Sequence, residues 1–247
     1  MFVLAGCGER ARVESVRWQV MGTVAAVSFK GAVLPALSED VRKVYAQMEN
    51  RLSAHNPDSE ASRFRSLDEV VPETRACYEA AFNICEQSGG AFNPFWRGRD
   101  KGIDLGAIAK GFAVDVAAAK INATGFPEGL LLDLGGNLKA VSGTWTTGIR
   151  DPDNPDGIIE KIILTNGMAC ATSGEYVRGK HIYDGRTGKP VDNNVLSVTV
   201  VHPTSAMLAD GLSTTLFVLG REEGDAFLRR FYPEARAVWV MQNAVTK

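Results

Sequence analysis

The chain has 247 residues and a formal net charge of −2 at pH 7, and 45% of its residues are hydrophobic and 23% charged. This length is ample for a hydrophobic core and allows one large domain or two small ones, in a composition ordinary for a soluble globular protein. The small net charge and the lack of any Lys/Arg run argue against a nucleic-acid surface, so we expect no nucleic-acid partner.

Residues 1–12 are interpreted as a truncated lipoprotein signal and an N-terminal linker. The run Leu4-Ala5-Gly6-Cys7 matches the lipobox that precedes a lipid-modified cysteine in bacterial lipoproteins. The basic region and the apolar stretch of about 7–15 residues typical of a signal peptide do not precede it. We expect a lipid on Cys7 that anchors the protein at the periplasmic face of the cell envelope. A chance match in a cytoplasmic protein is the alternative.

The first predicted elements are two strands within Val13–Phe29, which is rich in valine, alternates in polarity and is interrupted at Met21-Gly22-Thr23. A helix capped by Ser38 follows and extends to Leu52. The apolar stripe of this helix is Val41, Val44, Tyr45, Met48 and Leu52.

A polar loop over Ser53–Phe64, with a short helix after Pro57, leads to an amphipathic helix over Glu73–Ser88. Gly89-Gly90 ends this helix.

The cysteines are predicted to be free thiols. Cys77 and Cys85 lie about two turns apart on the helix just described, too far for a disulfide within one straight helix. Because no CxxC and no Cys/His cluster of zinc spacing occurs, we place Cys77, Cys85 and Cys170 in or near the core.

The stretch Ile103–Asp115 carries the first candidate binding site. Gly106 and Ala107 precede a helix, so a ligand can approach the backbone, and a helix start offers unpaired N–H groups to an anion. Lys110 adds a positive charge there. We predict the phosphate end of a nucleotide site, and ordinary packing with a solvated Lys110 is the alternative. Neither a P-loop nor a GxGxxG motif is present.

The middle of the chain is predicted to be mostly sheet. A buried strand over Leu130–Leu134 ends in Gly135-Gly136-Asn137. Further strands that continue this sheet are expected at residues 138–142, 144–149, 158–164 and 168–171.

The last part of the chain adds strands over Val195–Val201 and Ala235–Met241 and helices over Ala206–Leu219 and Glu222–Phe231. Hairpin-like strands mixed with separate helices predict an α+β fold, with residues 13–247 forming one compact domain.

Asp210 and Thr214 are four residues apart on the helix that begins at Ala206, so their side chains lie one above the other. A carboxylate and a hydroxyl are hard oxygen ligands, which suit Mg²⁺ because that ion uses few protein oxygens alongside water and substrate phosphate. The alternative is a threonine bonded back to a carbonyl of its own helix and an aspartate near the helix start. On these two residues alone, the alternative is favoured.

Hydroxyl and imidazole side chains supply further candidates. Thr172-Ser173-Gly174 ends a strand and offers donors to phosphate or ribose, unless it is an ordinary turn. His181 lies in a polar, turn-rich loop near Asp184 and is the candidate proton-transfer group. His55 and His202 lack comparable neighbours in the sequence and are interpreted as surface residues.

Eight short motifs stand in a recognisable order. They are Met21-Gly22-Thr23, Ser59-Glu60, Gly90–Pro94, Asp104–Gly111 continuing to Asp115, Leu134–Asn137, Thr172–Tyr176, His181–Asp184 with Thr187–Pro190, and Ala209–Thr214. In this order the chain resembles the ApbE family of FAD:protein FMN transferases, formerly called thiamine-biosynthesis lipoproteins. Each motif alone is weak, whereas eight in order are specific, and the resemblance covers about residues 16–220.

The resemblance implies a T-fold-like α+β domain with a mixed, largely antiparallel sheet and packed helices. It also implies an enzyme that binds FAD and Mg²⁺, releases AMP and attaches FMN to a threonine of an acceptor protein in an electron-transfer system. Family members are commonly exported lipoproteins, which agrees with the segment ending at Cys7.

The resemblance also implies site residues. Asp210, Thr214 and a backbone carbonyl at Ala107 would hold the metal. Lys110, His181 and Asp210 would be catalytic, because phosphoryl transfer requires charge neutralisation and an oriented acceptor hydroxyl. The residues expected to bind the flavin nucleotide are Met21, Ser59, Glu60, Asn93, Lys110, Asp115, Gly135, Gly136, Thr172, Ser173 and His181.

Three departures from the family pattern leave alternatives open. Asn93 stands where aspartate is usual, the segment Asn93–Asp104 is shorter than usual, and Gly185 replaces a usual proline. The alternatives are a flavin-binding relative that does not transfer, and an Mg²⁺-dependent FAD pyrophosphatase that releases FMN and AMP.

Overall fold

The computed structural model describes residues 2–4, 12–121, 129–152, 154, 156–175 and 179–242. Its main element is an antiparallel seven-stranded sheet in the order β12-β11-β8-β5-β4-β3-β2. The strands are β2 (Val13–Val20), β3 (Thr23–Lys30), β4 (Leu130–Leu134), β5 (Asn137–Ser142), β8 (Ala169–Gly174), β11 (Val195–His202) and β12 (Arg236–Met241). Together with the helices described below, this sheet confirms the α+β class. The family resemblance implied a mixed sheet, whereas the described strand pairs of this sheet are all antiparallel.

Among the described strands, two smaller sheets accompany the main one. The first has the order β1-β6-β7 and the second pairs β9 with β10. Their strands are β1 (Phe2–Leu4), β6 (Trp145–Arg150), β7 (Ile158–Leu164), β9 (Tyr183–Asp184) and β10 (Lys189–Pro190). The prediction that residues 144–149 and 158–164 continue the main sheet is therefore wrong. In the main sheet β8 lies beside β5, with Cys170 opposite Leu138. The β6–β7 hairpin therefore lies in the separate sheet that it forms with β1.

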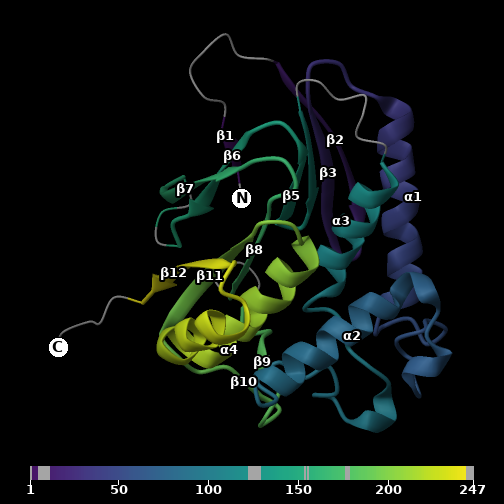
Figure 1. Ribbon diagram of the computed structural model, residues 1–247, viewed down its shortest axis with the longest axis vertical. Helices are drawn as coiled ribbons and strands as arrows, with labels where there is room; N and C mark the ends of the chain where they lie inside the picture. Colours follow the sequence, from purple (N-terminus) through teal and green to yellow (C-terminus); the bar gives the residue numbers. More distant parts are fainter. Residues whose placement is uncertain are drawn as a thin grey trace.

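In the part of the chain that the structure describes, four α-helices and two single-turn helices complete the fold, and the α-helices are labelled in Figure 1. They are α1 (Pro35–Leu52), η1 (Leu67–Glu69), α2 (Pro72–Gln87), η2 (Arg99–Lys101), α3 (Ala109–Lys120) and α4 (Ala206–Phe231). Gly220, at φ +76°, interrupts α4, so its two parts match the two helices predicted there. Cys77 and Cys85 are free thiols, as predicted, and Cys170 lies in the core.

Two local predictions differ from the structure. Ser38 is not the cap of α1, because the helix begins at Pro35, whose fixed φ and missing N–H suit a first helical position. The segment after Pro57 forms hydrogen-bonded turns instead of a short helix, with Ser59 N–H donating to the carbonyl of Asn56.

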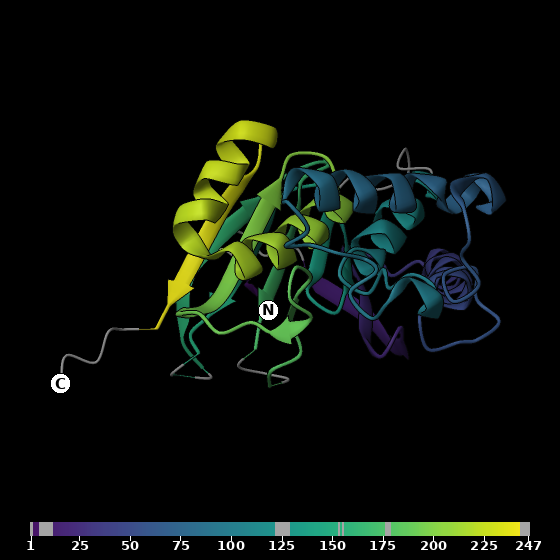
Figure 2. The same cartoon turned by 90° about the horizontal axis from the view of Figure 1, so that it is seen from below.

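The centre of the main sheet is buried on both faces, and β4 shows why. Leu130, Leu132 and Leu134 point into the core shared with the helices, whereas Leu131 points into a second core with Trp145 and other residues of β6 and β7. A strand that alternates between two buried faces needs apolar residues at nearly every position, which explains the Leu-Leu-Leu-Asp-Leu run. Figure 2 shows α2 and α4 as a layer on one side of the strands.

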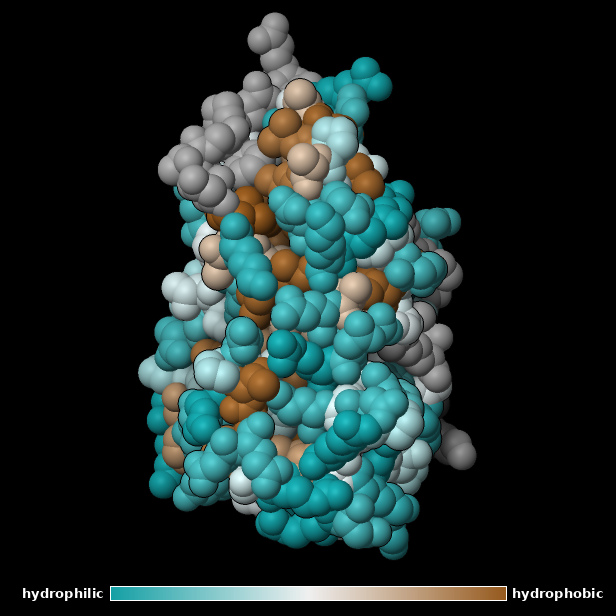
Figure 3. Space-filling model, turned by 90° about the vertical axis from the view of Figure 1, so that its right-hand side faces the viewer, coloured by the Kyte–Doolittle hydropathy of each residue, from teal (hydrophilic) through white to brown (hydrophobic). Residues whose placement is uncertain are grey.

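The surface on the α1 side is hydrophilic over most of its lower half, and apolar residues gather in its upper half (Figure 3). Among the described strands, large exposed apolar side chains are Val13 of β2, Val24 of β3, and Ile159 and Ile163 of β7. Among the described residues, no helix is both long and apolar enough to cross a membrane.

Candidate active site

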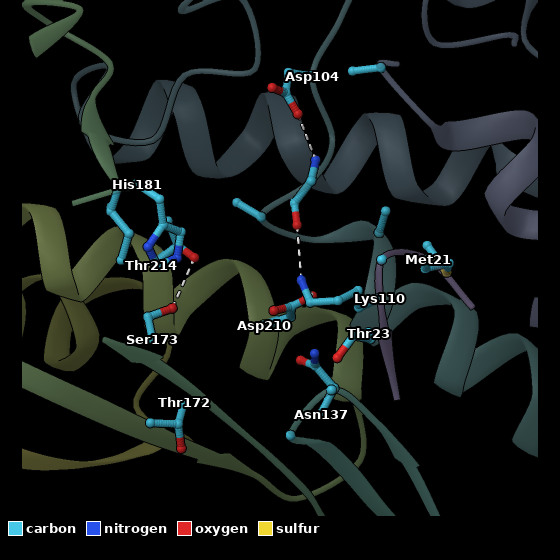
Figure 4. A pocket seen from close by; sticks show the side chains of 18 of the residues that line it. Met21, Thr23, Asp104, Lys110, Asn137, Thr172, Ser173, His181, Asp210 and Thr214 are labelled. Atoms are coloured by element: carbon cyan, nitrogen blue, oxygen red, sulfur yellow. Dashed lines mark hydrogen bonds and ion pairs between the residues drawn. The ribbon is translucent and has the colours of Figure 1, made fainter. Parts of the chain in front are cut away.

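A cavity of about 1250 Å³ opens between the helices and the ends of β3, β4 and β8. It gathers segments that are far apart in the chain, including the β2–β3 turn, the start of α3, the β4–β5 turn and the first turns of α4 (Figure 4). Eleven of the residues predicted for the site line it, namely Met21, Asn93, Ala107, Lys110, Gly135, Gly136, Thr172, Ser173, His181, Asp210 and Thr214.

Asp210 and Lys110 form the charged centre of this cavity. Lys110 Nζ lies 3.5 Å from Asp210 Oδ2 and donates to the carbonyl of Gly106 at 3.0 Å. The same Asp210 oxygen accepts the N–H of Gly111 at 2.9 Å. Burial raises the pKa of the Asp210 carboxyl, while the charge of Lys110 and the backbone donors of α3 lower it. Part of the anion site predicted at this helix start is therefore filled by a carboxylate of the protein itself.

The hydroxyl groups beside Asp210 form a connected set. Ser173 Oγ lies 3.0 Å from Thr214 Oγ1 and 2.8 Å from Ser213 Oγ, which joins the end of β8 to α4. Thr172 turns its hydroxyl to Thr199 at 2.7 Å. The strand β8 continues through Ser173 to Gly174, paired with β11, so these residues do not form the alternative turn.

The donor set around Asp210 fits a hard cation. The carboxylate of Asp210 and the hydroxyl of Thr214 both line the cavity. Gly111 donates its N–H to Asp210 instead of to the carbonyl of Ala107, four residues earlier, and Ala107 is one of the residues that line the cavity. No group of three or more His, Cys, Asp or Glu suited to a metal occurs among the described residues. A cation here would need oxygen from a bound phosphate or water to complete its shell.

Three residues predicted to bind the nucleotide lie outside the cavity lining, because each satisfies a neighbouring helix or loop. Ser59 is buried and donates to the carbonyl of Ser53. Glu60 accepts from the N–H of Val71 and the hydroxyl of Thr74 at the start of α2. Asp115 accepts bonds from the start of α4, as described below. The geometry gives these residues supporting roles.

Of the three histidines, His55 and His181 are exposed, as their polar sequence neighbours suggest, whereas His202 is buried. His181 is exposed at the cavity, and its Nδ1 lies 2.7 Å from the carbonyl of Gly179. His55 also lines the cavity. His202, interpreted as a surface residue, is only 4% exposed and contacts Glu234 at 3.3 Å. Burial lowers the pKa of His202.

Sequence reasoning missed an aromatic wall of the cavity. The rings of Trp96 and Tyr183 stack with centroids 4.4 Å apart and planes 15° apart. Trp96 Nε1 also donates to Asp104 Oδ2 at 3.2 Å, which holds the indole in place. An aromatic residue in a glycine-rich polar segment was a signal for Trp96, but nothing local pairs it with a tyrosine 87 positions later.

Two of the residues that depart from the family pattern, Asn93 and Gly185, are in contact. Asn93 Nδ2 donates to the carbonyl of Gly185 at 3.0 Å, and the N–H of Gly185 donates to the carbonyl of Ala91 at 3.0 Å. A Cβ atom on residue 185 would lie 2.3 Å from the Cβ of Asn93. A carboxylate at position 93 could not donate this bond, and a proline at position 185 has no N–H. Asn93 and Gly185 therefore form one contact, which joins the segment before Trp96 to the β9–β10 hairpin that carries Tyr183.

We expect Asn93→Asp to lower the free energy of unfolding by about 1–2 kcal/mol, because a carboxylate oxygen would face the Gly185 carbonyl without a proton between them. It should also weaken FAD binding, measured by flavin fluorescence, because the wall loosens. Asn193→Asp is the matched control, since Asn193 likewise joins a carbonyl (Phe217) and an N–H (Val195) but lies outside the cavity lining. Equal losses of FAD affinity in both variants would contradict the role of this contact.

Comparison with known proteins agrees with this geometry. The model of the ApbE family matches residues 21–101 and 95–239. The two matched segments meet inside residues 93–104, the segment predicted to be shorter than in the family.

Curated relatives carry one name. The FAD:protein FMN transferase of Treponema pallidum is 30% identical over an alignment of 322 positions that covers 97% of this chain and 88% of that protein. The protein of the same name from Vibrio cholerae serotype O1 is 39% identical over 137 residues, which cover 50% of this chain and 40% of the relative. The second alignment therefore spans less than half of the relative's length.

Solved structures match the fold over nearly the whole chain. The flavin transferase ApbE from Vibrio cholerae superposes with a TM-score of 0.80 at 24% identity, covering 94% of both chains. The ApbE protein from Thermotoga maritima gives a TM-score of 0.76 at 24% identity, covering 93% of this chain and 94% of that one. At this identity the match shows the fold alone.

Proposed function

The chain belongs to the ApbE family, and from that premise we propose that it is an Mg²⁺-dependent FAD:protein FMN transferase. It would move FMN from FAD to a threonine hydroxyl of an acceptor protein of an electron-transfer system and release AMP. The names of the curated relatives support the transfer from FAD to a protein. The Mg²⁺ requirement is supported by the oxygen ligands that line the cavity, and the threonine acceptor is what the family resemblance implies.

The observation that carries the proposal is the convergence of Asp210, Thr214 and Lys110 on one large cavity. A buried carboxylate, a hydroxyl and an ammonium within one wall suit a diphosphate bridge with a divalent cation. The cavity volume of about 1250 Å³ also leaves room for a ligand of dinucleotide size.

Asp210, Thr214 and the carbonyl of Ala107 would hold Mg²⁺, which when bound would neutralise negative charge on the diphosphate. Lys110 would add its ammonium charge from the first turn of α3, beside the Asp210 carboxylate, and would attract the diphosphate oxygens. Trp96 and Tyr183 supply a flat apolar wall against which a planar ring can stack.

The reaction breaks the phosphoanhydride bond of FAD and forms a phosphodiester bond to the acceptor. The acceptor threonine oxygen bonds to the phosphorus of the FMN half, and the bond from this phosphorus to the oxygen shared with AMP breaks. AMP leaves with that oxygen, and the threonine proton passes to a base. Because His181 donates from Nδ1 to the Gly179 carbonyl, its Nε2 is left as the acceptor for this proton.

Mixing the protein with FAD, Mg²⁺ and an acceptor domain that contains a target threonine tests the proposal. Covalent flavin on the acceptor, with equimolar AMP, is the expected result. Free FMN and AMP in equal amounts with unmodified acceptor would identify a pyrophosphatase instead. Bound FAD that stays unchanged would identify a flavin carrier and refute transfer.

We expect His181→Ala to slow transfer about 10²–10³-fold through loss of the base. The dissociation constant of FAD should change far less, because the ring of His181 is exposed at the cavity edge. Transfer rates at saturating FAD and FAD titrations followed by flavin fluorescence separate the two effects. Weakened FAD binding with an unchanged maximal rate would make His181 a binding residue.

We also propose export and lipid attachment at Cys7, which lies outside the described residues. The support is the match of Leu4-Ala5-Gly6-Cys7 to a lipobox. Mass spectrometry of the N-terminal peptide from the native protein would show the lipid, and an unmodified Cys7 would favour a cytoplasmic protein.

A further inference from the structure

The N-terminal ends of the helices α3 and α4 are each hydrogen-bonded to a carboxylate of the other helix. Asp115 of α3 accepts bonds from the first turn of α4, and Asp210 of α4 accepts a bond from the first turn of α3. On each helix the residues concerned are four apart, Gly111 with Asp115 and Ala206 with Asp210, so they share one helix face. Each helix therefore has its start capped by the other.

Asp115 uses both of its oxygens in this arrangement. Oδ1 accepts from Ala206 N at 3.0 Å and from Lys139 Nζ at 2.8 Å. Oδ2 accepts from Met207 N at 2.9 Å and from the hydroxyl of Ser205 at 2.8 Å. All four donors are supplied by protein, and Asp115 does not line the cavity. The resemblance-based expectation that Asp115 binds the nucleotide therefore has no support in this geometry.

The two helices can approach this closely because residue 111 is glycine. A Cβ atom there would lie 2.2 Å from the carbonyl oxygen of Ala206 and 2.8 Å from the Cβ of Asp210. The place of Asp210 in the cavity thus depends on where the first turn of α4 sits against α3.

We propose that Asp115 is a positioning residue, which sets the Asp210 carboxylate against Gly111 and Lys110 by capping α4 from α3. The proposal deepens the proposed function, because the cation and the diphosphate would meet Asp210. Asp115 itself touches neither. An asparagine at this position would offer one acceptor oxygen where two are used, so even the isosteric change disturbs the cap.

The first test uses the protein without ligands. In Asp115→Asn, the amide proton of Gly111 should exchange with solvent at least about tenfold faster than in the parent, measured by NMR, because its bond to Asp210 loosens. Asp225→Asn is the matched control. Asp225 lies on α4, beyond Gly220, and accepts the indole N–H of Trp239 at 2.9 Å. Unchanged exchange at Gly111 in Asp115→Asn, or equal acceleration in both variants, would overturn the proposal.

The second test titrates Mn²⁺ into the FAD-saturated protein and follows free Mn²⁺ by electron paramagnetic resonance. Loss of a residue that orients a metal ligand typically weakens metal binding about 10–100-fold, and we expect this for Asp115→Asn but not for Asp225→Asn. Unaltered Mn²⁺ affinity in Asp115→Asn would overturn the positioning role. A parent protein that binds no Mn²⁺ would refute the proposed function, and the Gly111 exchange would then decide the positioning role alone.

Should Asp115→Asn fail to fold, Ser205→Ala decides. This variant removes one of the four donors to Asp115 and the hydroxyl that accepts from Leu208 N. Faster Gly111 exchange than in Asp225→Asn supports the proposal, and equal exchange overturns it.

Discussion

Replacing Asp210 by asparagine is expected to lower the rate of FMN transfer by about 10³-fold and to abolish its dependence on Mg²⁺. Asparagine keeps the volume of the side chain and an oxygen that can accept the N–H of Gly111, so the start of α3 stays capped. It removes the negative charge that opposes Lys110 and that a divalent cation needs. The loss should therefore fall on catalysis and cation binding, while the melting temperature changes little.

Transfer rates over a range of Mg²⁺ concentrations, together with thermal melts, test this expectation. Asp40→Asn is a suitable control because Asp40 is an exposed residue of α1 that pairs with Lys43. The control should behave like the parent in both measurements. If Asp210→Asn kept full activity with the usual Mg²⁺ response, Asp210 would not be a metal ligand.

The variant Gly111→Ala is expected to lose stability and activity together. An added methyl group would lie 2.2 Å from the carbonyl oxygen and 2.6 Å from the carbonyl carbon of Ala206, and backbone atoms cannot turn aside as a side chain can. Moving α4 away should cost about 3 kcal/mol, which exceeds the gain of about 1 kcal/mol that alanine brings to a helix. A shift of about 1 Å in Asp210 would reduce transfer about a hundredfold.

Urea unfolding and transfer assays on Gly111→Ala test this pair of effects. Ala118→Gly, on the same helix, is the matched control, because it should lose about 1 kcal/mol of helix propensity without moving α4. The control should keep the transfer rate of the parent. A Gly111→Ala variant that is more stable than the parent would show that the helices separate without cost, contrary to the packing of α3 on α4.

Residues with a single local role were predictable from the sequence. The stripe of Val41, Val44, Tyr45, Met48 and Leu52 is buried on α1, because a helix repeats its face every three to four residues wherever the chain goes. Spacing likewise placed Asp210 and Thr214 on one side of their helix, and both line the cavity. The order of the motifs indicated the family that the comparisons then showed.

Partners far apart in the chain were not predictable. Glu60 and Asp115 were expected at the nucleotide, yet they cap α2 and α4, because a carboxylate binds whichever unpaired N–H groups the fold brings to it. The strand β4 could be read as buried, but not that its two faces belong to separate cores or that β6 and β7 leave the main sheet.

The sequence by itself determined the α-helices and the strands of the main sheet, the α+β class and the candidate cluster at the starts of α3 and α4, because these depend on spacing along the chain. Only the tertiary structure decided which polar groups face the cavity. A side chain such as Asp115, Trp96 or Asn93 is directed by partners many residues away, and the path of the backbone between them is set by the packing of the whole core.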